Sequence, residues 1–200
     1  MARILVVRHG ESTWNAAGRV QGHADPPLSG LGERQAEAAA RSPLLVAVER
    51  VWSSDLARAR VTADLIATAR GLEAVADSRW RERSTGTWTG MTRAEIEAVA
   101  PGGFSRGPRP PGWEDDASVL TRALAVLAEL ASAVGDGDAL VVSHSGVLRT
   151  LERRLGAPPE PVPNLGGRFF ELTGERPPAL GARIVLVDPD DVEVTIPGQM

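Results

Sequence analysis

The residues best suited to chemistry in this sequence are two histidines, His9 and His144, which end two similar segments. His9 follows an apolar run over residues 4–7 and Arg8, and His144 follows a second apolar run over residues 139–142 and a serine. Continuous apolar runs of this length are typical of parallel strands that are buried on both faces. Because ligands bind at the carboxyl ends of such strands, we expect both histidines to face one pocket.

An arginine directly before a histidine favours phosphoryl transfer. The positive charge of Arg8 lowers the pKa of His9 and keeps the imidazole neutral, which makes it a nucleophile. The planar guanidinium group also matches the geometry of a phosphate. A second phosphate-binding arginine is expected early in a helix that follows another strand, because a helix N-terminus favours anions. Both Arg58 and Arg60 have this placement, and the spacing does not separate them.

Phosphoryl transfer to a histidine also needs an acid that protonates the leaving oxygen. Glu82 lies in an arginine-rich segment that two glycines follow, but composition alone does not separate it from Glu11 and Glu114. No histidine pair at metal-binding spacing and no glutamate-rich cluster accompanies His9 and His144, so we expect no metal site. The arginines are then expected to stabilise the charge of the transferred group.

Composition restricts the class of protein. A length of 200 residues with 42% apolar residues predicts a single domain over residues 1–200. A net charge of −4 gives no indication of a nucleic-acid surface. The chain has no cysteine, which excludes disulfides and fits a reducing compartment. The first apolar run is too short for a secretion signal or a membrane span, so we expect a cytoplasmic protein without a membrane partner.

All 22 basic residues are arginines, which excludes the lysine of a phosphate-binding P-loop and Schiff-base chemistry.

The elements that must position these residues alternate between strands and helices. Asp55 is predicted as the N-cap of a helix whose apolar face includes residues 56, 59, 63 and 66. The other expected elements are a loop over 10–28, a helix over 31–41, strands over 51–53 and 74–76, a short helix that Thr92 and Glu95 cap, a helix over 115–134 with Leu120, Leu124, Leu127, Leu130 and Val134 buried, and antiparallel edge strands over 168–172 and 184–187. This alternation predicts an α/β fold with a mixed, mostly parallel sheet.

Five segments, taken in order, resemble the histidine phosphatase superfamily, which is also called the phosphoglycerate mutase-like family. They lie at residues 8–15, 18–29, 53–63, 81–90 and 142–147, and the resemblance covers about residues 2–173. It implies a three-layer sandwich in which helices flank the central sheet, and an enzyme that needs no cofactor and no metal. A dimer is common in this family, so the resemblance also implies a homodimer.

The resemblance implies a role for each candidate residue. His9 is the expected nucleophile, which carries a phosphohistidine, and Glu82 protonates the leaving group and then activates water. The expected phosphate-binding residues are Arg8, Asn15, Arg58 and His144, and Gln21 and Gly22 are expected to line the substrate mouth. His23 is expected at the surface or behind the catalytic residues. Trp80 stands where a leucine is common in the family; core packing is the expected role of each tryptophan, and narrowing or reshaping of the entrance is the alternative for Trp80.

The expected activity is hydrolysis of a phosphomonoester of a small metabolite. The segment over residues 91–112 is short and lacks lysine and tyrosine, which favours a phosphatase over a mutase. Arg83, Arg106 and Arg109 keep the mutase alternative open, because each could hold a second negative group.

Two alternatives from other functional classes compete with the phosphatase. The first is a phosphate-ester binding or regulatory module without turnover, against which stands the presence of every expected catalytic group. The second is a serine hydrolase that uses Ser145, but the residues on either side lack the glycines of the Gly-x-Ser-x-Gly motif.

Overall fold

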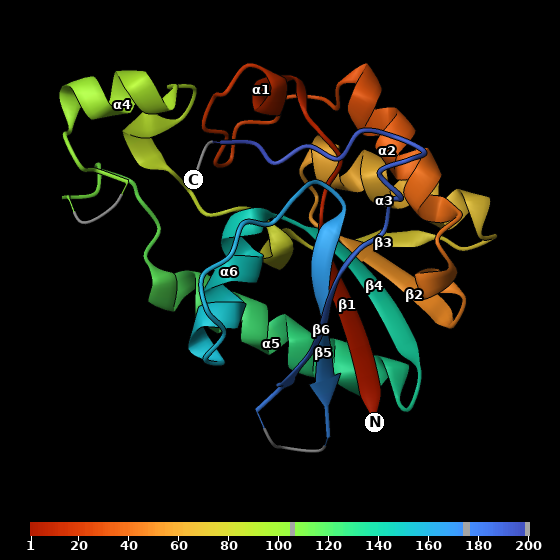
Figure 1. The fold of residues 1–200 in the computed structure, drawn as a ribbon. Coiled ribbons are helices and arrows are strands. Elements are labelled where there is room, and N and C mark those ends of the chain that lie inside the picture. Colours follow the sequence, from red (N-terminus) through yellow and green to blue (C-terminus); the bar gives the residue numbers. More distant parts are fainter. Residues whose placement is uncertain (105–106, 174–176, 199–200) are drawn as a thin grey trace.

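The two apolar segments that end in histidines form neighbouring strands at the centre of one sheet. The computed structural model describes residues 1–104, 107–173 and 177–198. In this part of the chain, β1 (Ala2–Arg8) and β4 (Asp138–Ser143) pair in parallel, with Arg8 opposite Ser143. The six strands lie in the order β3-β2-β4-β1-β5-β6 (Figure 1). The parallel pairing brings the carboxyl ends of β1 and β4, and therefore both histidines, to one edge.

The expected mixed, mostly parallel sheet is confirmed. Strands β2 (Val48–Ser53) and β3 (Ala74–Ala76) extend the parallel part beside β4. Strands β5 (Gly166–Leu172) and β6 (Ala179–Val185) are antiparallel, as expected. The expectation that both are edge strands is wrong for β5, because β5 pairs with β1 as well as with β6. Of these two strands, only β6 lies at an edge of the sheet.

Alternate residues of β1 belong to two separate cores, which is why its central residues 4–7 are all apolar. Leu5 and Val7 pack with α2 (Gly30–Ala40) and α3 (Ala57–Ala69) on one face of the sheet. Ile4 and Val6 pack on the other face with α5 (Asp116–Val134) and α6 (Ser145–Arg154). Burying each of these side chains stabilises the fold by about 1.5–3 kcal/mol. Helices therefore cover both faces of the sheet, which confirms the three layers (Figure 1).

The start of α3 differs from the prediction. The N-cap of α3 is Leu56 and makes no side-chain cap. The Asp55 carboxylate instead accepts hydrogen bonds from Arg81 at 2.8 and 2.6 Å. The N–H of Ala57, the first residue of α3, donates to Asp25 Oδ1 at 2.7 Å. Asp25 comes from a distant loop, so the cap of this helix is a tertiary contact that local sequence rules do not detect.

Helix α5 begins after Asp115, whose side chain accepts a hydrogen bond from the N–H of Ser118. By length and composition this helix matches a membrane span, but one face packs on the sheet and on α6. The buried stripe is rotated from the predicted one, because Leu120 and Leu124 are only partly buried. The buried residues are Val119, Ala123, Val126, Leu127 and Leu130.

The expected loop over residues 10–28 contains a short helix, α1 (Thr13–Ala16). This helix begins with a capping box between Ser12 and Asn15. The expected short helix after Thr92 is α4 (Arg93–Val99), and its predicted capping box with Glu95 is confirmed. Three 3-10 turns complete the described elements: η1 (Pro43–Leu45), η2 (Ser78–Trp80) and η3 (Gly86–Trp88).

Candidate active site

His9 and His144 lie side by side at the carboxyl edge of the sheet, as expected. The N–H of His9 continues the β1–β4 ladder by donating to Ser143 O at 3.0 Å. The centroids of the two imidazole rings are 5.1 Å apart, and the ring planes meet at 64°. Both residues are almost fully buried. The two segments that look alike in the sequence therefore form one site.

The surroundings of His9 leave one ring nitrogen unprotonated, as a nucleophile must be. Nδ1 lies 2.6 Å from Gly10 O, and because a carbonyl can only accept, Nδ1 carries the proton. Nε2 accepts a hydrogen bond from Arg58 Nε at 3.2 Å, so its lone pair is unprotonated. Burial, and then the charges of Arg58 and Arg8, hold the pKa of His9 well below its ordinary value. The ring is therefore neutral at neutral pH.

Two buried arginines surround the imidazole of His9. Arg58 is fully buried and donates to Ala24 O at 2.8 Å and to Gly22 O at 2.9 Å, besides its bond to His9. Arg8 donates to Val162 O at 2.9 Å. Burial lowers the pKa of each arginine to about 10, so both remain cationic at neutral pH. Arg60, the alternative to Arg58, points away and pairs with Asp64 on the helix surface.

Several buried nitrogen atoms at this site have no hydrogen-bond partner among the described residues. They are Nε of Arg8 and both ring nitrogens of His144. Burial, followed by the charge of Arg58, holds the pKa of His144 well below its ordinary value, so one of these nitrogens carries a proton and can donate. Buried polar groups are nearly always paired, and an orphaned group costs roughly 1–3 kcal/mol. These atoms therefore indicate a polar ligand that belongs between them.

The loop after His9 contributes to the wall of the same site. The side chain of Asn15 lies near the backbone of His9, because Asn164 Nδ2 donates to His9 O at 2.8 Å and to Asn15 Oδ1 at 3.5 Å. Gln21 and Gly22 line the small cavity that His9 and Arg8 also line. Gly22 has a φ of 51°, and a Cβ there would lie 2.4 Å from Thr85 Oγ1, so only glycine fits.

Glu82 also lines this cavity, which has a volume of about 20 Å³. One carboxylate oxygen accepts from the N–H of Arg83 at 2.8 Å, and the other accepts from the N–H of Gly146 at 3.2 Å. The two rival carboxylates are engaged elsewhere, since Glu11 accepts from Ser29 and Glu114 pairs with Arg122. Among the three glutamates that the sequence left open, only Glu82 lies beside His9.

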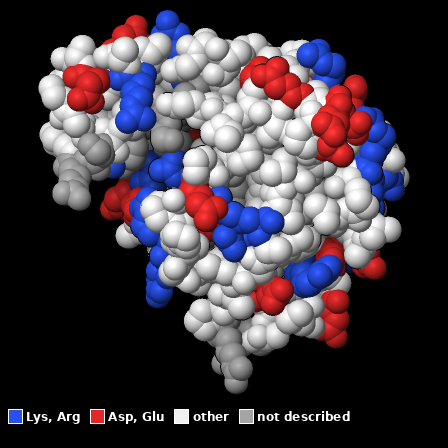
Figure 2. Space-filling model, in the orientation of Figure 1, with Lys and Arg blue, Asp and Glu red and all other residues white. Residues whose placement is uncertain are grey.

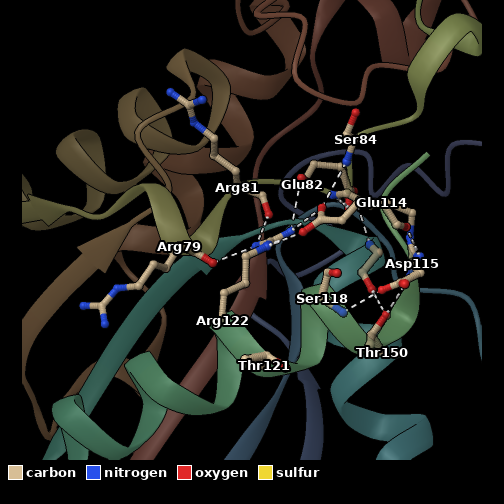
Figure 3. A network of polar contacts seen from close by, with 12 residues as sticks. Arg79, Arg81, Glu82, Ser84, Glu114, Asp115, Ser118, Thr121, Arg122 and Thr150 are labelled. Carbon is tan, nitrogen blue, oxygen red and sulfur yellow. Dashed lines mark hydrogen bonds and ion pairs between the residues drawn. The ribbon is translucent and has the colours of Figure 1, made fainter. Parts of the chain in front are cut away.

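Arg122 of α5 fixes the segment that carries Glu82, and no sequence signal pointed to it. Its guanidinium donates to the carbonyls of Arg79, Arg81 and Glu82 at 2.6, 2.7 and 3.3 Å. It also pairs with Glu114 at 2.8 Å, as Figure 3 shows. An arginine on an amphipathic helix usually lies on a solvated face, so only the tertiary contacts identify this role.

Comparison with known proteins places the chain in a family. Residues 4–173 match the family model of the histidine phosphatase superfamily (branch 1). The chain belongs to this superfamily.

Its relatives within the superfamily include a glucosyl-3-phosphoglycerate phosphatase of Mycolicibacterium vanbaalenii, with 37% identity over 82% of this chain and 79% of the relative. A probable phosphoglycerate mutase of Yersinia enterocolitica is 34% identical over 80% of this chain and 77% of the relative. A solved mycobacterial glucosyl-3-phosphoglycerate phosphatase in complex with VO3 superposes with a TM-score of 0.80 and 29% identity. That superposition covers 90% of this chain and 97% of the solved one. The resemblance to the superfamily and the expected sandwich fold are confirmed.

The structure also shows the surroundings of Trp80 and His23. Trp80 is fully buried in the core beneath β1 and β4, which confirms core packing and excludes the alternative that it narrows the entrance. A bulky apolar side chain is more stable there than at a solvated mouth. His23 is exposed and lies next to the backbone of Glu82, with its Nε2 2.7 Å from Glu82 O.

The arginines that left mutase activity open differ in their surroundings. Arg83 is buried and donates to Glu114 O, Asp116 and Thr150. Arg109 donates to Gly103 O and stacks over Trp113. Arg106 lies outside the described residues. The described residues contain no group of three or more histidines, aspartates and glutamates that could hold a metal ion.

Proposed function

We propose that this protein hydrolyses phosphomonoesters of small metabolites through a phosphohistidine intermediate on His9. The observation that carries the proposal is the set of buried nitrogens of Arg8 and His144, around the neutral ring of His9, that have no hydrogen-bond partner in the described part of the chain. A phosphoryl group is tetrahedral and carries several acceptor oxygens, so it would satisfy these donors together. Its negative charge would also compensate the two buried guanidinium groups of Arg8 and Arg58.

In the first step, His9 Nε2 attacks phosphorus while the bond from phosphorus to the ester oxygen breaks. The electron pair of the broken bond goes to the leaving oxygen, and Glu82, in its protonated form, donates the proton that makes this product an alcohol. The hydrogen bond between Nδ1–H and Gly10 O stabilises the positive charge that develops on the ring. Arg58 donates to Nε2 in the free protein, so its N–H must turn to a phosphoryl oxygen when the substrate binds.

In the second step, water attacks the phosphorus of the phosphohistidine. Glu82, now a carboxylate, takes a proton from the water as the phosphorus–nitrogen bond breaks, and inorganic phosphate leaves. Arg8, Arg58, His144 and Asn15 would hold the phosphoryl oxygens through both steps. Preorganised cationic donors of this kind stabilise the charge of the transition state without reorganisation.

The experiment combines turnover with trapping of the intermediate. The protein is expected to hydrolyse p-nitrophenyl phosphate, and a chelator is expected to leave the rate unchanged, because the proposed chemistry uses no metal. A protein quenched during turnover of ³²P-labelled substrate should carry an acid-labile, base-stable label, and His9→Ala should remove it. Label on serine would refute the mechanism. Substrate binding without turnover would identify a binding module instead.

A mutase remains the second candidate, because a probable phosphoglycerate mutase is among the relatives and arginines lie close to Glu82. A mutase must exclude water and hold a second negative group. Incubation with 3-phosphoglycerate and its bisphosphate, followed by analysis of the isomers, separates the two. Release of phosphate without isomerisation supports the phosphatase.

We further propose that the protein is a single domain that works in the cytoplasm. The absence of cysteine from the chain supports a reducing compartment. A homodimer, which is common in the superfamily, stays a prediction that sedimentation analysis would test.

A further inference from the structure

A second, larger cavity opens next to the phosphate site. It has a volume of about 390 Å³, and its described lining includes five arginines and two aspartates. The arginines are Arg83, Arg93, Arg109, Arg149 and Arg153, and we call this cavity the arginine pocket. Basic side chains gather along the hollow on this side of the molecule (Figure 2). Its small size and excess of positive charge fit a small anionic group.

The arginine pocket adjoins the cavity that His9 and Glu82 line. Arg83 lines both cavities, and its backbone N–H holds one oxygen of Glu82. Gly146 also lines the arginine pocket, and its N–H holds the other oxygen of Glu82. A leaving group whose ester oxygen takes its proton from Glu82 would therefore extend toward the arginine pocket.

Most of the arginines in this pocket are already engaged. Arg83 and Arg153 share the carboxylate of Asp116, each at 2.5 Å. Arg109 donates to a backbone carbonyl and lies 4.6 Å from the ring centroid of Trp113. These contacts hold the wall in place and compensate much of its charge.

Arg149 and Arg93 differ from the other three arginines of this pocket, because no hydrogen bond or ion pair joins either of them to any other residue that the structure describes. Arg93 is exposed and lies 5.8 Å from the ring centroid of Phe104. Arg149 is half-buried on α6, one turn after His144. Burial lowers its pKa, and the charges of Arg153 and Arg83 lower it further, while Glu82 raises it. A partly desolvated guanidinium with no partner is a favourable site for an anion.

Resting on the proposed function, we propose that the arginine pocket binds a carboxylate on the leaving group of the substrate, with Arg149 as its main partner. The substrate class would be phosphate esters of small hydroxy acids. The two parallel N–H groups of the half-buried Arg149 guanidinium match the planar, singly charged carboxylate, and the exposed Arg93 lies in the same wall. A second phosphate carries up to two negative charges, whereas Arg149 is the one half-buried guanidinium in the described wall without a hydrogen bond or ion pair, so a single negative charge is the better match.

The test compares substrates that differ only at the carboxylate. The pairs are 3-phosphoglycerate with glycerol 3-phosphate, and phosphoserine with phosphoethanolamine. In the unmodified protein, kcat/KM is expected to be at least about tenfold higher for the carboxylated member of each pair. Arg149→Gln should lower this ratio by about 10- to 100-fold, the effect expected for one hydrogen bond to a charged group. Arg149→Lys should restore part of it.

Arg154→Gln provides the matched control, because Arg154 lies on the same helix, is exposed and does not line the arginine pocket. It should leave the ratio unchanged. A ratio near one in the unmodified protein, or an equal loss in both variants, would overturn the proposal. A higher kcat/KM for 2,3-bisphosphoglycerate than for 3-phosphoglycerate would show that the pocket takes a phosphate. That result would also overturn the proposal.

Failure of this proposal can be distinguished from failure of the proposed function. p-Nitrophenyl phosphate has no carboxylate, so its hydrolysis tests the phosphatase alone. If turnover is absent, the same preference can be measured by calorimetry as a ratio of Kd values. The titrations use 3-phosphoglycerate and glycerol 3-phosphate with His9→Ala protein, with and without Arg149→Gln. Equal Kd values for the two compounds would then refute the pocket. If Arg149→Gln does not fold, Arg93→Gln serves as the second variant, with a smaller loss of the ratio expected, and no loss would overturn the proposal.

Discussion

A single added methyl group, in Gly146→Ala, tests whether Glu82 is the proton donor. Gly146 is the second residue of α6, and its N–H holds the Glu82 carboxylate. A Cβ at this position would lie 2.2 Å from Glu82 Oε1, whereas an ordinary contact begins at 3.4 Å. The carboxyl group must therefore move by more than about 1 Å, a misplacement that typically costs about 10²-fold in rate.

The same substitution should not weaken the fold. Alanine is about 1 kcal/mol more favourable than glycine within a helix. The predicted result is therefore an unchanged or higher melting temperature together with a kcat/KM for glycerol 3-phosphate that is lower by about 10²-fold. An alkyl leaving group needs its proton, whereas p-nitrophenolate leaves with little help, so hydrolysis of p-nitrophenyl phosphate should fall much less.

The matched control is Gly30→Ala at the start of α2, where a Cβ would meet only Arg34 Nη1, at 3.7 Å. It should change neither substrate's rate. Steady-state kinetics on both substrates, with thermal melts of each variant, provide the readout. An unchanged rate on glycerol 3-phosphate, or an equal loss on both substrates, would refute the role of Glu82 as the acid.

Three further results are expected. Arg122→Gln should lower kcat on glycerol 3-phosphate by roughly tenfold and lower kcat on p-nitrophenyl phosphate less, because it frees the segment that carries Glu82. A kcat on glycerol 3-phosphate equal to that of the unmodified protein would contradict this. Because the folded pKa values of His9 and His144 are lowered, the unfolded chain binds protons that the folded protein does not. The free energy of urea unfolding should therefore fall as pH drops below about 6.5. Each of the two histidines contributes up to about 1.4 kcal/mol per pH unit to this slope, so His144→Gln should make it less steep. Asp25→Ala removes the cap on the N–H of Ala57 and should destabilise the protein by about 1 kcal/mol, whereas an unchanged urea midpoint would show that the cap is unimportant.

Much of the fold could be predicted from the sequence because its signals are local. The strands that end at Arg8 and Ser143 each have four consecutive apolar residues at their centre, and this pattern requires helices on both faces of a parallel sheet. The capping box at Thr92 and the glycine with positive φ at residue 71 also follow from neighbouring residues alone.

Predictions about individual side chains were weaker where partners come from distant segments. Asp55 has the residue type and position of an N-cap, yet its carboxylate pairs with Arg81 and Asp25 caps the helix instead. At this helix a tertiary contact outweighs a local capping preference of about 1 kcal/mol.

By itself, the sequence determined the chemistry that this protein can perform: histidines after apolar strands, arginines to hold an anion, and no lysine or cysteine. Spacing left Arg58 and Arg60 equivalent, and composition did the same for Glu82 and Glu114; before the structure, only the resemblance to the superfamily favoured one of each pair. Only the tertiary structure shows which of them lie beside His9: Arg58 and Glu82 do, whereas Arg60 pairs with Asp64 and Glu114 with Arg122. It also shows that Arg149 has no hydrogen bond or ion pair with any other described residue. The physical reason is that residue type sets what a group can donate or accept, whereas burial and proximity depend on contacts between segments far apart in the chain.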